Sequence, residues 1–254
     1  MTELHATENR FGGMYIHADG LPDSADLFSD MLQKALHAWK DAARKVAWLD
    51  IPSAKSHLIP AAVARGFQFH HCEGEHLILI TRLIEDAFIF PYASHYAAAG
   101  AVVLSEENDL LVVKERYRNP DRKEFYKLPG GLLNEAEHIA DAAVREVREE
   151  TGIEAEFQAL TCFRHIHHLN FGKSNFYFIC RMKPLSFDIT IDENEIEEAF
   201  WMPVQEFLTH ANVHAFNKQI VATSLTHATL HPVILPGDHR HPSESEIFLP
   251  SDVS

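Results

Sequence analysis

The stretch GLLNEAEHIADAAVREVREETGI, residues 131–153, decides what fold and what chemistry we expect of this chain. Within it Glu146, Glu149 and Glu150 stand three and four positions apart. Residues at these spacings lie on one face of an α-helix, so a helix over about residues 135–151 would carry three carboxylates on one side. Such a cluster needs open solvent or cations. Hard oxygen donors on one face suit Mg²⁺ or Mn²⁺.

The three glutamates alone leave an alternative open, because a solvated acidic helix face has the same pattern. The residues around them favour a site. Gly130 and Gly131 precede the helix and permit backbone conformations and close approaches that other residues bar. Arg145 is expected two helical turns after Glu137, where it can orient carboxylates, and Gly152 is a natural end for the helix.

The whole stretch resembles the Nudix box, Gx5Ex7REUxEExGU with U apolar, and matches it at every fixed position. Average composition makes chance agreement on the order of 10⁻⁸ per starting point. The resemblance implies an α/β/α sandwich in which the box forms a loop, a helix and a loop. It also implies Glu146, Glu149 and Glu150 as metal ligands, a backbone carbonyl near Gly131 as a further one, and Arg145 with Glu137 as an orienting pair.

The same resemblance implies hydrolysis of nucleoside diphosphates linked to another moiety X. Bound Mg²⁺ or Mn²⁺ would neutralise the diphosphate and activate a water for attack at phosphorus. Many members use an additional glutamate outside the box as ligand or base. Glu195 is our candidate, followed by Glu197 and Glu198, and an ordinary surface acid is the alternative for each. A nucleotide-sensing regulatory protein with little hydrolysis is the alternative function, although such domains often lose box carboxylates that are all present here.

Similarity outside the box indicates a subgroup. It includes plant ADP-ribose/NADH pyrophosphatases and the vertebrate Nudix protein encoded antisense to basic fibroblast growth factor. The similar segments lie in residues 48–52, 56–60, 66–71 and 93–95. ADP-ribose or NADH is therefore the expected substrate. Two substrate markers are missing, however: the SQPWPFPxS motif, and a proline about sixteen residues after the box.

An adenine ring would need an aromatic or apolar clamp. Tyr96, Phe125 and Tyr126 are the substrate-binding candidates, with Phe163 as a further one. A place in the hydrophobic core is the alternative for each of them.

Three parts are expected along the chain: a pre-Nudix domain over residues 1–92, a Nudix domain over 93–236 and a loosely held tail over 237–254. The first part has the order strand, helix, strand, helix, hairpin, with Asp23 or Ser24 as the helix N-cap. That order is similar to half of a GNAT fold. The RxxGxG/A loop that would grip acetyl-CoA is absent, so we expect substrate cover, dimerisation or regulation instead. In the second part, residues 97–104 and 110–115 are expected to form a hairpin.

Bulk composition excludes several classes of protein. A net charge of −15 argues against a nucleic-acid binder, but a few cations or a divalent metal can still hold a small nucleotide-sugar or dinucleotide. No apolar run is long enough to span a membrane and no secretory signal is visible, so a cytoplasmic protein is expected, with a homodimer as one form of assembly. Three cysteines without CxxC spacing argue against disulfides and structural zinc and favour buried reduced thiols.

Overall fold

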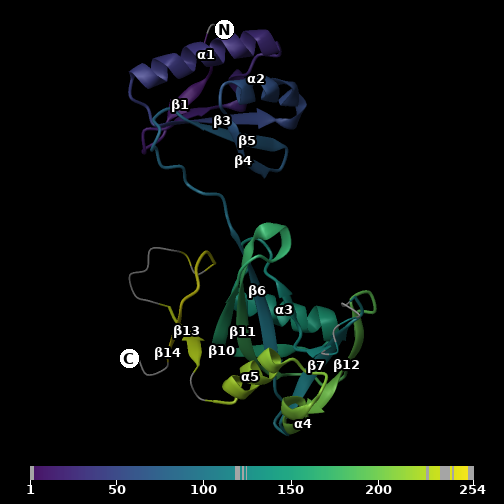
Figure 1. Cartoon of the computed structure of the whole chain (residues 1–254). Helices are drawn as coiled ribbons and strands as arrows, with labels where there is room; N and C mark the ends of the chain where they lie inside the picture. The colour runs from purple at the N-terminus through teal and green to yellow at the C-terminus, as the bar shows by residue number, and fades with distance from the viewer. Residues whose placement is uncertain are drawn as a thin grey trace. The chain divides into compact units, whose positions relative to one another are not determined.

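The chain divides into two compact units, Met1–Ala93 and Ser94–Ser254 (Figure 1). Within the described residues, no helix combines the length and the apolar character needed to cross a membrane. The computed structural model describes residues 3–117, 121, 123, 125–226, 229–234, 241 and 243–250.

The first unit is a five-stranded sheet with its helices packed against one face. The strand order is β1-β2-β3-β5-β4, in which only the β2–β3 pair is parallel. Alternate residues of β3, Ala47, Leu49 and Ile51, are fully buried beneath the helices. The elements are β1 (Ala6–Glu8), β2 (Met14–Ile16), η1 (Ala18–Gly20), α1 (Ala25–Asp41), β3 (Val46–Pro52), η2 (Ser53–Leu58), α2 (Ile59–Ala64), β4 (Gln68–Glu73) and β5 (His76–Arg82).

Local signals explain most of this unit. The Ser24 hydroxyl accepts the backbone N–H of Leu27 at 3.3 Å, so Ser24 is the N-cap of α1, one of the two residues predicted. The expected order of strand, helix, strand, helix and hairpin is present, and β1 adds a strand that was not predicted. The likeness to half of a GNAT fold stays a prediction.

The second unit has the predicted α/β/α layers. A six-stranded sheet has the order β14-β13-β10-β11-β6-β9, and a three-stranded sheet has the order β12-β7-β8. Helix α3 packs on one side through a core that includes Val147, Ala99 and Cys180. Helices α4 and α5 contribute to a second core. The elements are β6 (His95–Val103), β7 (Asp109–Glu115), β8 (Tyr126–Lys127), β9 (Gly130–Leu132), α3 (Ile139–Thr151), β10 (Ala155–Ile166), η3 (Asn170–Gly172), β11 (Ser174–Pro184), β12 (Ile196–Pro203), α4 (Val204–Thr209), α5 (Ala215–Ser224), β13 (Leu230–Pro232) and β14 (Phe248–Pro250).

The predicted hairpin of β6 with β7 is wrong. The two strands lie in different sheets, and only the isolated bridge between Leu104 and Leu110 joins them. Residues 98–103 and 110–113 are buried without interruption. A lone hairpin would leave one face of such strands in water, whereas two packed layers bury both faces.

Helix α3 begins later than predicted, at Ile139 rather than near residue 135. Ala136 has a φ of 58°, a left-handed conformation that cannot continue a helix, and the N–H of Glu137 bonds the Asn134 carbonyl instead. The predicted end is confirmed, because Gly152 takes a φ of 71° and its N–H bonds the Arg148 carbonyl at 2.8 Å.

The C-terminal residues are attached more firmly than we expected. Strand β14 pairs with β13, and a Glu246 oxygen accepts the N–H of Ile139 at 2.6 Å. Residues 237–240, 242 and 251–254 of the expected tail lie outside the described residues. Among the cysteines, which are all free, Cys180 is buried as predicted and Cys162 is half-buried, but Cys72 is exposed.

Candidate active site

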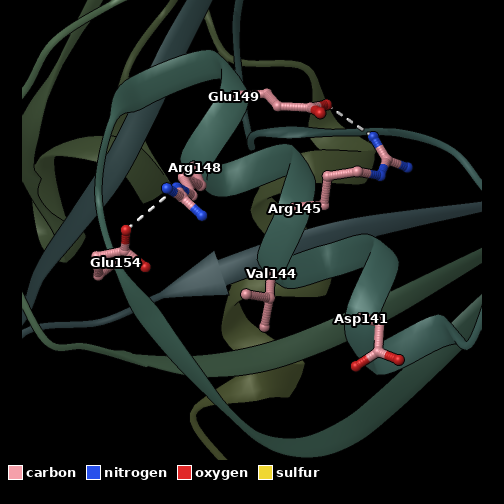
Figure 2. Close-up of a pocket in the computed structure, with 6 residues that line it drawn as sticks. All are labelled: Asp141, Val144, Arg145, Arg148, Glu149 and Glu154. Atoms are coloured by element: carbon pink, nitrogen blue, oxygen red, sulfur yellow. Dashed lines mark hydrogen bonds and ion pairs between the residues drawn. The ribbon is translucent and has the colours of Figure 1, made fainter.

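Arg145 on α3 bonds three of the carboxylates that the sequence singled out. Its guanidinium bonds Glu137 twice, at 2.7 and 2.9 Å, and bonds one oxygen each of Glu146 and Glu149 at 2.8 Å. Figure 2 shows the bond from Arg145 to Glu149 on the outer side of the helix. Nη2 also donates to the Leu132 carbonyl at 3.0 Å. These carboxylates raise the pKa of Arg145, the hydrogen bond to Glu137 having the largest effect, so the side chain stays charged.

Glu150 is the buried carboxylate of the set. It is only 5% exposed, and burial raises its pKa to about 7. Two groups oppose that rise: the ammonium of Lys127, 3.9 Å from Oε1, and the N–H of Gly130, which donates to Oε2 at 3.1 Å. Neither contact compensates fully for the loss of water.

Glu146 faces the glycine that precedes the helix. A Cβ on Gly131 would come within 2.5 Å of a Glu146 carboxylate oxygen, so only glycine leaves this space clear. Burial raises the pKa of Glu146, Arg145 opposes the rise, and the charges of Glu149 and Glu195 add to it. The cluster therefore holds more negative charge than its own cations balance.

The donor set fits a hard divalent cation. Oε2 of Glu146 and Oε1 of Glu149 have no hydrogen-bond partner in the described part of the chain. Carboxylate oxygens with incomplete charge balance are the ligands that Mg²⁺ and Mn²⁺ prefer. Even so, no three carboxylate, imidazole or thiol groups of the described residues converge closely enough to form a complete coordination shell. Arg145 holds one oxygen of Glu146 and one of Glu149 in this arrangement.

The glutamates near residue 195 differ in their surroundings. Glu195 precedes β12, its carbonyl accepts the N–H of Arg116 at 2.7 Å, and its charge raises the pKa of Glu146. Glu197 instead pairs with Lys114 at 2.7 Å. The pKa of Tyr126 is raised chiefly by burial, and the charge of Glu198 raises it further. Of the three, Glu195 is thus the one whose charge acts on the box carboxylates.

The predicted aromatic clamp residues do not form one group. Tyr126 packs against Phe125, Phe200 and His210 at ring distances of 4.6, 5.3 and 5.1 Å. Tyr96 lies on the six-stranded sheet opposite Asn175.

Phe163 is also on the six-stranded sheet, where it pairs with Phe178 and is 61% exposed. Asn175 and Phe178 are three residues apart on β11, so Tyr96 and Phe163 point to opposite faces of that sheet. A single adenine ring therefore cannot contact all four candidates.

Some residues near the site were not predicted. Lys127 links Glu150 to Glu115, whose carboxylate it also bonds. Tyr177 packs closely on Gly100, since its hydroxyl would lie only 2.0 Å from a Cβ added to that glycine. Burial is the main cause that raises the pKa of Tyr177, and the charge of Glu150 adds to it. The strand-end position of Glu115 and the Lys-Leu-Pro-Gly run at 127–130 were the available signals.

Asn175 was also missed. It is 5% exposed, and its Oδ1 has no hydrogen-bond partner in the described part of the chain. No sequence signal indicates this, because burial of one amide depends on strand register.

A cavity of about 480 Å³ opens on the outer side of α3 (Figure 2). Arg145 and Glu149 line it beside Arg148, which pairs with Glu154 at 3.2 Å. The metal-ligand candidate Glu149 is therefore accessible from this side, whereas Glu150 faces the interior.

Comparison with known proteins shows the family of the chain. A model described as the NUDIX domain matches residues 94–223, and one described as a Nudix hydrolase domain matches residues 4–83. The chain belongs to the Nudix hydrolase family. The predicted kinship with plant and vertebrate Nudix proteins is confirmed by similarity to curated members.

Nudix hydrolase 8 of Arabidopsis thaliana is 39% identical over 207 residues, covering 81% of this chain and 56% of its own length. Nudix hydrolase 2 of the same plant is 36% identical over 216 residues, 85% of this chain and 77% of its own. Human "Nucleoside diphosphate-linked moiety X motif 6" is 37% identical over 228 residues, 86% of this chain and 71% of its own. The chain thus spans just over half of the first of these Nudix proteins.

Among solved structures, a NUDIX hydrolase from Nitrosomonas europaea matches 53% of this chain and 90% of its own, with a TM-score of 0.45 and 24% identity. The NUDIX domain of Shewanella oneidensis NrtR, solved with ADP ribose, matches 52% of this chain and 88% of its own chain, with a TM-score of 0.43 and 14% identity.

Proposed function

We propose that this Nudix protein is a metal-dependent pyrophosphohydrolase that cleaves the diphosphate of a nucleoside diphosphate linked to X. The observation that carries the proposal is that Glu146 lies against Gly131 and Glu150 bonds Gly130, while Glu146 and Glu149 each keep one oxygen without a partner among the described residues. These three side chains and the Gly131 carbonyl would hold Mg²⁺ or Mn²⁺. When bound, the cation supplies charge neutralisation at the diphosphate and a more acidic water.

The chain's own residues have distinct tasks in this proposal. Arg145 positions Glu146 and Glu149 through its 2.8 Å hydrogen bonds and ties them to Glu137. Glu150, with a pKa of about 7, is partly protonated near neutral pH and would hold a cation in its ionised form. Glu195 serves as the additional ligand or as the base that takes a proton from the attacking water.

ADP-ribose and NADH are the proposed substrates. The support is the similarity to the subgroup defined by residues 48–52, 56–60, 66–71 and 93–95. Tyr126 and Phe125, whose rings pack edge to face at 4.6 Å, and Tyr96 on the larger sheet are proposed to contact the base or ribose.

The test is a panel of diphosphates with Mg²⁺ and with Mn²⁺, in which products are identified by mass. ADP-ribose should yield AMP and ribose phosphate, and NADH should yield AMP and the reduced mononucleotide. Glu150→Gln should lower turnover by orders of magnitude while circular dichroism stays unchanged. Glu154→Gln is the matched control, since Glu154 lies just past the same helix and, among the described residues, its carboxylate pairs with the exposed Arg148 alone.

Near-normal activity in Glu150→Gln would contradict the metal assignment. Folded protein that binds ADP-ribose but releases nothing from any diphosphate would make the protein a nucleotide sensor instead.

A further inference from the structure

A large cavity in the first unit has no part in the hydrolysis proposed above. It has a volume of about 1410 Å³ and lies on the sheet face opposite α1 and α2. Its floor includes Tyr15 of β2 and Val46 and Trp48 of β3. Residues 46 and 48 alternate with the fully buried Ala47 and Leu49, so they point to the side that the helices leave open.

A strap formed by residues 83–90 crosses this open face and makes one wall of the cavity. Both ends are fixed. The N–H groups of Leu83 and Ile84 bond the Lys45 carbonyl at 2.9 and 3.3 Å, and the His70 imidazole bonds the Phe90 carbonyl at 2.8 Å.

The middle of the strap packs on the sheet through Ala87 and Ile89. Ala87 is 8% exposed and packs on Val46 and Ile80. Phe88 and Phe90, which also line the cavity, are 76% and 73% exposed. Large apolar side chains left in water beside a concave surface indicate a binding site.

The rings around the cavity favour a flat ligand. Tyr15 and Trp48 lie on the floor, Phe88 and Phe90 on the strap, and Phe11 on the turn between β1 and β2. Aromatic side chains stack on planar ring systems and bury large area with little loss of conformational entropy.

Two cations mark one end of the cavity. Arg10 stands over the Phe11 ring at 4.7 Å, and Lys45 lies beside Gly12, whose carbonyl accepts the Lys45 N–H at 2.9 Å. Neither side chain forms an ion pair with another described residue. Glu8, which lies two positions from Arg10, forms its ion pair with Arg44. In a chain of net charge −15, unpaired cations beside aromatic rings favour an anionic ligand.

Two carboxylates also line the cavity. Glu73 of β4 lies opposite His76 of β5, and His76 in turn lies opposite Pro52 at the end of β3. Lys45 precedes the start of β3, so Glu73 and Lys45 line opposite ends of the cavity. Asp86 is on the strap. An anion is thus favoured at the Arg10 and Lys45 end only, and Asp86 weakens its binding.

We propose that this cavity binds a small planar aromatic anion, with its ring between the floor and strap aromatics and its anionic group at Arg10 and Lys45. This site is independent of the diphosphate chemistry of the second unit. The probe is the dye anilinonaphthalene sulfonate, itself a planar aromatic anion, titrated into the full chain and followed by fluorescence.

We expect one saturable site. Replacing both cations, Arg10→Gln with Lys45→Gln, should weaken dye binding about tenfold or more. Phe88→Ala should weaken it about fivefold. Asp86→Asn should tighten binding. Phe88 and Asp86 lie on the exposed strap, so these variants should retain the wild-type melting temperature.

Phe171→Ala is the matched control, since Phe171 is 92% exposed in the other unit, and Glu150→Gln tests independence from the proposed active site. Both should bind dye as wild type does. Displacement by AMP would identify the anion class as a nucleotide, and displacement by benzoate would identify an aromatic carboxylic acid. Any of four results would overturn the proposal. The variants could all bind the dye equally, Asp86→Asn could bind it more weakly, or Glu150→Gln could lose binding. The fourth is that neither AMP nor benzoate displaces the dye at millimolar concentration.

Discussion

The Arg145 guanidinium binds the Glu137 carboxylate through two parallel hydrogen bonds, Nε to Oε1 at 2.7 Å and Nη2 to Oε2 at 2.9 Å. Glu137 lies outside α3, in the turn before it. The same guanidinium bonds the Leu132 carbonyl. One side chain therefore fastens strand β9 and the turn before α3 to the helix that carries the carboxylates.

Arg145→Lys should lower kcat/KM about 10- to 100-fold and raise the Mg²⁺ concentration needed for half-maximal rate, because an ammonium cannot reproduce the two-pronged contact. It should also lower the free energy of unfolding by about 2 kcal/mol, since one ammonium cannot keep all the hydrogen bonds that the guanidinium makes to the three carboxylates. Arg148→Lys is the control, because the pair of Arg148 with Glu154 is exposed, and its effect should stay below about 0.5 kcal/mol. Equal effects of the two substitutions on the Mg²⁺ requirement would contradict this role.

Two adjacent glycines should respond differently to alanine. Gly130 has a φ of 150°, and a Cβ there would lie 2.3 Å from the Ala99 carbonyl oxygen, so Gly130→Ala should cost several kcal/mol of stability, on the order of 3. In Gly131→Ala the nearest atoms to the added Cβ are those of the Glu146 carboxylate, at 2.5 Å, and not backbone, so the fold should persist while metal-dependent turnover falls. Thermal melts and turnover of both variants test the pair. A Gly131→Ala protein with wild-type turnover would show that the Glu146 position is unimportant.

Glu150 should make the metal-free protein sensitive to pH. Its folded pKa of about 7 is above the ordinary 4.5, so folding favours the protonated acid. Below pH 4.5 Glu150 is protonated in both the folded and the unfolded state, so burying it carries no penalty and does not lower the free energy of unfolding through ionisation. The penalty grows between 4.5 and 7 as only the unfolded state ionises, and above 7 it is fully present, on the order of 3 kcal/mol.

Glu150→Gln should therefore raise the melting temperature in a chelator at pH 8 and leave it nearly unchanged at pH 4. Thermal melts at both pH values measure this. A stabilisation that is equal at both would rule out ionisation as its cause.

Glu246 should stabilise the start of α3. The N-cap residue His138 makes no side-chain capping bond, and Glu246 accepts the Ile139 N–H at 2.6 Å from over a hundred positions away. Glu246→Gln should cost about 1 kcal/mol, because the negative charge at the helix N-terminus is lost. Glu244→Gln, in the same segment, should be neutral, and urea unfolding of both variants would measure the difference.

The sequence by itself determined that α3 ends at Gly152 and limited the N-cap of α1 to Asp23 or Ser24, and its resemblance to the Nudix box implied the α/β/α class. The helix ends follow from single residues with strong conformational preferences, which act within a few positions, whereas the α/β/α class follows from the family resemblance.

Only the tertiary structure decided the rest. Residues 97–104 and 110–115 look like a hairpin locally, but their continuous burial separates them into two sheets. The raised pKa of Glu150 depends on burial, and the cap from Glu246 joins distant segments. Such properties depend on which surfaces leave water together, and that is set by packing across the whole fold, beyond the reach of local spacing.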